Sequence, residues 1–139
     1  MNVRLMILLA LCALASACNL DLQPLTAPPP GRVAEINPAN GKIVMSQGVA
    51  LAVQCTDGCD GVCVRPRFSV DNGEVLDVRP GFLGSSNDNL NASSVNDDTR
   101  IQILVAQTPG TSKLRVKSTC TDRNYTVTVL AEDPNDDQP

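Results

Sequence analysis

The stretch FSVDNGEVLDV, residues 68–78, decides the fold class. Two short alternating runs, residues 68–70 and 74–78, flank the triplet Asp71-Asn72-Gly73. An Asn-Gly pair between alternating apolar runs is a strong hairpin signal, because both residues tolerate the positive φ that tight turns require. The stretch therefore predicts two β-strands joined by a hairpin turn.

Short alternating runs separated by turn residues continue on both sides of this stretch, and none shows a sustained 3.6-residue period. The expected strands lie at residues 33–36, 42–45, 49–55, 63–70, 74–78, 99–106, 113–120 and 124–131. Seven to eight short strands at these intervals predict an all-β sandwich.

Three of these runs carry a resemblance to a known family. Residues 68–78, the run TPGTSKLRV at 108–116 and the run YTVTV at 125–129 are similar to a bacterial immunoglobulin-like domain of the group-2 type. The resemblance implies an immunoglobulin-like β-sandwich over residues 33–131, in a family that commonly serves in adhesion and assembly. Two features depart from the family: the cysteines clustered at 55–63 and a long polar insert before residue 98.

The beginning of the chain has the pattern of an export signal. One basic residue, Arg4, precedes an uncharged apolar run at residues 5–15. A helix of this length reaches about 16 Å, roughly half the hydrocarbon thickness of a bilayer, so the run predicts a signal-peptide core and not a membrane span.

Residues 14–18, LASAC, allow two processing routes. The small residues Ala15-Ser16-Ala17 fit an ordinary secretory cleavage site, whereas the whole run resembles the lipobox of bacterial lipoproteins. Cleavage after residue 17 leaves five cysteines, Cys18, Cys55, Cys59, Cys63 and Cys120. Lipid on Cys18 would leave four, which can pair. We therefore expect a signal peptide at 1–17 and lipidation of Cys18, with simple secretion as the alternative.

The lipoprotein resemblance implies a location. Cys18 would carry a diacylglyceryl group that anchors the protein to a membrane of the bacterial cell envelope. Asn19 follows it, in place of the aspartate that retains enteric relatives in the inner membrane. This favours the outer membrane.

Removal of residues 1–17 from the 139-residue chain leaves 122 residues, enough for one domain. Arg4 leaves with the leader, so ten basic residues face fifteen acidic ones and the net charge is −5. This balance, with no basic cluster in the sequence, argues against nucleic acid as a partner. Anionic headgroups would also repel the chain, so we expect membrane contact through the lipid alone.

Two segments flank the expected sandwich. Residues 18–32 contain Pro28-Pro29-Pro30, which favours an extended conformation, so we expect a proline-rich linker there. Residues 132–139 are acidic and contain two prolines, which predicts a disordered tail.

The four remaining cysteines predict two disulfides, because an exported protein meets an oxidising compartment. Strand alternation places Cys55 and Cys120 on inward faces and Cys63 outside. In an immunoglobulin-like order their strands are second and sixth, which predicts Cys55–Cys120 with Cys59–Cys63. The pairing Cys55–Cys59 with Cys63–Cys120 stays open. A four-thiolate metal site is the functional alternative.

No histidine occurs in the chain, which excludes Ser–His and Cys–His nucleophile pairs. The three lysines and the turn aspartates have ordinary structural explanations. We expect no enzymatic activity and no cofactor. The sequence indicates a non-catalytic binding or scaffolding module with an unknown protein or glycan partner. The alternatives are a passive spacer in an envelope complex and a small hydrolase.

Overall fold

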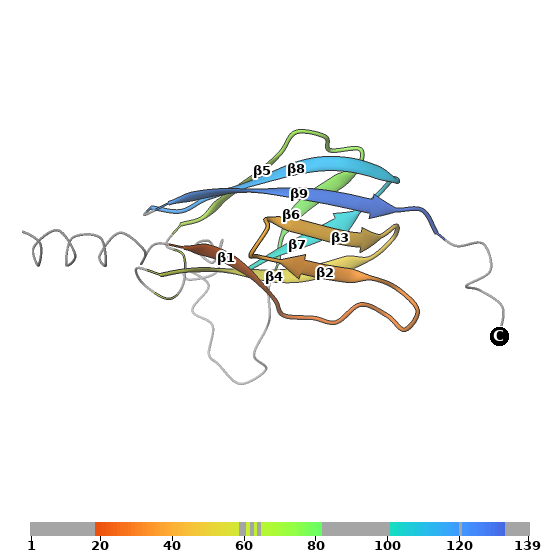
Figure 1. Ribbon diagram of the computed structural model, residues 1–139, viewed down its shortest axis with the longest axis horizontal. Coiled ribbons are helices and arrows are strands. Elements are labelled where there is room, and N and C mark those ends of the chain that lie inside the picture. Colours follow the sequence, from red (N-terminus) through yellow and green to blue (C-terminus); the bar gives the residue numbers. More distant parts are fainter. Residues whose placement is uncertain are drawn as a thin grey trace, which may run out of the picture.

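Two β-sheets packed face to face form the protein, as the computed structural model shows (Figure 1). The structure describes residues 19–58, 61, 63, 65–81, 101–119 and 121–132. The four-stranded sheet has the order β1-β4-β7-β6, with strands β1 (Leu20–Pro24), β4 (Ala50–Asp57), β7 (Ile101–Ala106) and β6 (Leu76–Pro80). The five-stranded sheet has the order β2-β3-β9-β8-β5, with strands β2 (Ala34–Asn37), β3 (Lys42–Ser46), β9 (Asp122–Leu130), β8 (Gly110–Lys117) and β5 (Arg67–Val70).

This topology confirms the expected immunoglobulin-like sandwich. Strands β1, β4, β7 and β6 take the places of strands A, B, E and D, and β5, β8 and β9 those of C, F and G. Strands β2 and β3 extend the second sheet beyond β9, to which β3 is parallel. The other strand pairs are antiparallel.

The core follows the alternation that the sequence predicts. In β8, Ser112, Leu114 and Val116 are buried, while the basic residues between them are exposed. Strands β4, β7 and β9 contribute further aliphatic side chains, and Tyr125 is the largest fully buried residue. Because the chain has two Phe, one Tyr and no Trp, this core consists almost entirely of aliphatic side chains.

The hairpin predicted at residues 68–78 does not form, although both of its strands do. Strands β5 and β6 do not pair with each other; β5 pairs with β8 in one sheet and β6 with β7 in the other. The turn between them is of a helical kind, because the Val75 and Leu76 amides both donate to the Asn72 carbonyl oxygen. Gly73 does not adopt a positive φ, so the hairpin turn does not form.

Asp71 fixes this crossing between the sheets. Its carboxylate accepts hydrogen bonds from the Lys113 amide (2.7 Å) and the Ser112 hydroxyl (2.9 Å). These bonds stabilise the charged form, so they lower the pKa of Asp71 below its ordinary value of 3.8, the Lys113 amide contributing most.

The depressed pKa of Asp71 predicts a pH dependence of stability. A carboxylate that is more acidic in the folded state stabilises the fold above its unfolded pKa, and this contribution is lost as the pH falls through the folded value. We expect Asp71→Ala to destabilise the domain at neutral pH and to have a smaller effect in acid. Urea unfolding at a series of pH values measures the difference. Glu74→Gln, which removes a charge from the same turn, is the control and should show a smaller, less pH-dependent effect.

The largest departure from the sequence-based expectation lies at the start of the domain. The segment 18–32 was expected to be a linker outside the core, but Leu20–Pro24 forms the edge strand β1, paired with β4. Leu20 and Leu22 are each 2% exposed and belong to the hydrophobic core. A strand ending at Pro24 is possible because an edge strand tolerates proline.

Candidate functional site

The first described residues of the chain are hydrogen-bonded into the sandwich at the end where β1 begins. We call this end the entry end (left in Figure 1). The carbonyl oxygen of Asn19 accepts a hydrogen bond from the Gly58 amide at 3.0 Å. Leu20 then pairs with Asp57 at the end of β4. The chain therefore becomes part of the sheet at Leu20, two residues after Cys18 in the sequence.

Arg123, near the start of β9, ties three segments together at the entry end. Its guanidinium donates to the Leu20 carbonyl oxygen at 2.8 Å and also to the carboxylate of Asp21. A third bond reaches the Pro38 carbonyl oxygen in the turn between β2 and β3. One side chain thus joins β1 to the opposite sheet.

Tyr125 lies beneath this arginine. Its ring is fully buried, its hydroxyl donates to the Leu20 carbonyl oxygen at 3.3 Å, and the Arg123 guanidinium lies 5.2 Å from the ring centroid. Burial raises the pKa of the Tyr125 phenol above its ordinary value of 10.0, while the charge of Arg123 acts in the opposite direction.

The pKa of Tyr125 can be measured directly because it is the only tyrosine and the chain has no tryptophan. In the folded state the phenol keeps its proton above its ordinary pKa, so its stabilising contribution is present below the unfolded value and is lost as the pH rises further. We expect the phenolate absorbance of the native protein to rise at a higher pH than that of the urea-unfolded protein. Coinciding titration curves would contradict the burial of this ring.

A disulfide closes the loop that follows β4. Cys55 and Cys63 are bonded, with a Cα–Cα distance of 5.4 Å, and both are fully buried. The Cys63 amide also donates to the Cys55 carbonyl oxygen at 3.1 Å. This pairing overturns both pairings expected from the sequence, Cys55–Cys120 and Cys55–Cys59.

The cause of the wrong pairing is local. The expected strand 63–70 placed Cys63 outside by alternation, but β5 begins only at Arg67. Arg65 has a φ of +48°, which breaks the extended backbone and with it the alternation. Cys63 therefore turns inward. The other cysteines of the expected sites, Cys18, Cys59 and Cys120, lie outside the described residues, as do residues 82–98 of the polar insert.

Three carboxylates of the described strands form ion pairs with arginines. Asp122 is bonded to Arg115, which lowers the pKa of Asp122 below 3.8 with a further contribution from the charge of Lys117. Asp77 is bonded to Arg79 at 2.7 Å, and Asp21 to Arg123. Among the described residues, no group of three His, Cys, Asp or Glu side chains is placed to hold a metal ion. Nor does that part of the chain contain a helix long and apolar enough to cross a membrane.

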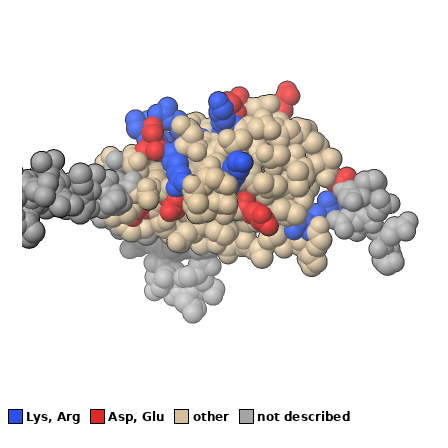
Figure 2. Space-filling view, in the orientation of Figure 1, with Lys and Arg blue, Asp and Glu red and all other residues tan. Residues whose placement is uncertain are grey.

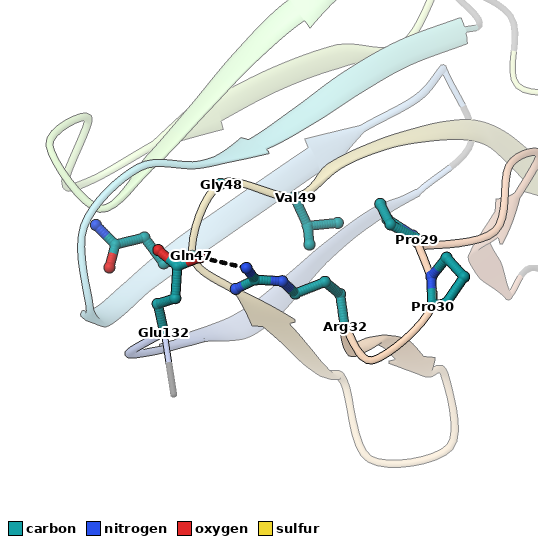
Figure 3. A pocket seen from close by; sticks show the side chains of 7 residues that line it. All are labelled: Pro29, Pro30, Arg32, Gln47, Gly48, Val49 and Glu132. Carbon is teal, nitrogen blue, oxygen red and sulfur yellow. Dashed lines mark hydrogen bonds and ion pairs between the residues drawn. The ribbon is translucent and has the colours of Figure 1, made fainter. Parts of the chain in front are cut away.

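A shallow hollow of about 370 Å³ lies at the opposite end of the sandwich, called here the far end (Figure 3). An ion pair between Arg32 and Glu132 crosses it and connects the segment before β2 to the segment after β9. Its remaining lining comes from Pro29, Pro30, Gln47, Gly48 and Val49. Because its basic and acidic side chains bind each other, we interpret the hollow as a structural contact between two chain segments.

The fold and the entry end define an immunoglobulin-like β-sandwich module whose first strand begins at Leu20, two residues after Cys18 in the sequence. No protein-family model matches the chain, and no curated protein matches it. Three solved structures that it is similar to are parts of the S-layer protein SbsC. For domains 4 and 5 the TM-score is 0.39, with 15% identity over 80% of this chain and 54% of that one.

For SbsC domains 5–6 the TM-score is 0.42, with 18% identity over 75% of this chain and 47% of that one. For domains 4–9 the TM-score is 0.42, with 15% identity over 81% of this chain and 15% of that one. This chain thus spans about half the length of each of the two shorter fragments.

Proposed function

We propose that this protein is a lipid-anchored, non-catalytic immunoglobulin-like module of the bacterial cell envelope, with Cys18 as its lipid-bearing residue. The observation that carries the proposal is the position of β1. Cys18, which ends the lipobox-like run LASAC, is followed by Asn19 and then by a buried strand residue, Leu20. An anchor on Cys18 would therefore be joined directly to the folded domain.

Cysteine parity supports the same proposal. With Cys55 bonded to Cys63, the cysteines left after residue 17 are Cys18, Cys59 and Cys120, again an odd number. In the sequence, Cys59 follows Gly58, and Cys120 lies between Thr119 and Thr121. These three described neighbours all lie at the entry end. We therefore propose that Cys59 and Cys120 form the second disulfide, which leaves the thiol of Cys18 for lipid.

The state of the charged groups supports a binding or scaffolding role over a catalytic one. A pair of catalytic carboxylates needs one group with a raised pKa and a partner free to react. Here Asp71 and Asp122 have lowered pKa values, and Asp21, Asp77 and Asp122 are each bonded to an arginine. The partner we propose is a protein or glycan of the envelope.

Fatty-acid labelling in a bacterial host tests the anchor. We expect the wild-type protein to incorporate a clickable fatty acid and to sediment with membranes, and Cys18→Ala to lose both properties. Cys12→Ala is the matched control, since it removes a cysteine from the proposed leader and should leave labelling unchanged. An unlabelled wild-type protein in the soluble fraction would contradict the proposal.

A passive spacer within a larger envelope complex is the second candidate. The direct joining of β1 to the sheet through Arg123 favours it, because a rigid connection transmits position without requiring a binding surface. The two roles differ in whether the immobilised domain binds a partner. A binding module should enrich a defined protein or glycan from envelope extract when immobilised by its C-terminus, and a spacer should enrich none.

A further inference from the structure

Exposed basic side chains lie together at the entry end. Arg67 at the start of β5 is the register partner of Lys117 at the end of β8, and both are exposed. Arg65 is exposed two residues before Arg67. None of these three makes an ion pair with another described residue. We call Arg65, Arg67 and Lys117 the basic cluster.

The strand register places this cluster at the same end of the sandwich as the first described residues of the chain. In the pairing of β8 with β9, Lys117 is opposite Asp122, and Val116 is opposite Arg123. The Arg123 guanidinium in turn donates a hydrogen bond to the Leu20 carbonyl oxygen. Basic side chains are visible at this end in Figure 2, with acidic ones beside them. Asn19, the residue that follows Cys18 in the sequence, and the basic cluster thus lie at the same end of the sandwich.

The described acidic residues at the entry end do not neutralise the positive charge of the basic cluster. Asp21 and Asp122 are occupied by Arg123 and Arg115, and Asp57 is only 4% exposed. At the far end, Glu132 is paired with Arg32, and the exposed acids Asp71 and Glu74 follow β5. The described charges are therefore uneven along the molecule, positive at the entry end and negative at the far end, although the whole chain is acidic.

We propose that Arg65, Arg67 and Lys117 bind the anionic headgroups of the membrane that holds the Cys18 lipid, so that the domain stands on that membrane by its entry end. This inference rests on the proposed lipid attachment. It also changes the expectation drawn from net charge, since the molecule can present its positive end to a negative surface while its acids face away.

The expected strength follows from surface electrostatics. A basic side chain near an anionic bilayer contributes about 1 kcal/mol, which is about fivefold in affinity. Such binding is weak alone, and it becomes effective when a lipid already holds the protein at the surface. It should weaken as salt screens the charges.

Co-sedimentation with vesicles tests the proposal without the lipid. The protein used is the chain from residue 18 with Cys18→Ala, which keeps every residue that the structure describes. We expect it to bind vesicles containing phosphatidylglycerol and phosphatidylcholine, and to bind phosphatidylcholine vesicles much less. Lys117→Gln should weaken this binding about fivefold and Arg67→Gln with Lys117→Gln about 25-fold.

Lys113→Gln is the matched control, because Lys113 lies on the same strand and the same exposed face as Lys117, towards the far end. It should change the affinity by less than about twofold. Equal effects of Lys113→Gln and Lys117→Gln, equal binding to both vesicle types, or no binding would each overturn the proposal. Because the assay uses unlipidated protein, these outcomes are independent of whether Cys18 is acylated, which fatty-acid labelling reports separately.

Discussion

Replacement of Tyr125 by alanine is expected to lower the free energy of unfolding by about 3–5 kcal/mol, the cost found for truncating large buried aromatic side chains. Tyr125 is the largest fully buried residue, and it lies under β1 with its hydroxyl on the Leu20 carbonyl oxygen. Its removal leaves a cavity that the surrounding aliphatic side chains cannot fill. Since small domains are stable by only about 5–15 kcal/mol, the variant should be close to unfolding.

Urea unfolding followed by far-UV circular dichroism measures this loss. Tyr125→Phe is the control, since it keeps the ring and removes only the hydroxyl's hydrogen bond, and it should cost about 1 kcal/mol. If the alanine variant unfolds within about 1 kcal/mol of the wild-type protein, the ring does not fill the core as described.

Removal of the disulfide by Cys55→Ala with Cys63→Ala is expected to have the second largest effect. The two cysteines are eight positions apart, and closing so short a loop in the unfolded chain contributes about 2.5 kcal/mol in the chain-entropy model. Both sulfur-bearing side chains are fully buried, so the loss of their packing adds to this amount.

The same urea titration provides the measurement, made in the presence and absence of reductant. Under reducing conditions the wild-type protein should lose most of its stability advantage over the double variant, because the disulfide is reduced once the chain unfolds. In the native state, the Cys55–Cys63 bond should resist reductant, since neither residue is exposed. A double variant as stable as the oxidised wild-type protein would contradict the pairing of these two residues.

Most of the sheet architecture could be predicted because it is encoded in local alternation. The expected strand 42–45 coincides with β3 to within one residue, and 49–55 covers β4 except for its last two residues. The alternation of Leu20 and Leu22 is also present in the sequence, but it is only three residues long and is followed by prolines, which favour a linker. Edge strands need few residues and tolerate proline, so this signal is inherently short.

The features that could not be predicted depend on single backbone conformations. The positive φ of Arg65 reverses the side of Cys63, and alternation cannot reveal such a break. In the same way, the turn after β8 begins at Ser118, whose amide donates to the Thr121 carbonyl oxygen at 2.8 Å, whereas alternation extended that strand to residue 120. The contacts of Arg123 join segments far apart in sequence, and no local pattern signals them.

The most direct test of the account is an intact-mass measurement of the protein extracted from its host's membranes, with and without reductant. The account predicts a chain that begins at Cys18, carries the added mass of acyl groups, and gains the mass of the hydrogens of two disulfides on reduction. A chain without acyl groups, or one that still carries residues 1–17, would contradict the proposed anchor.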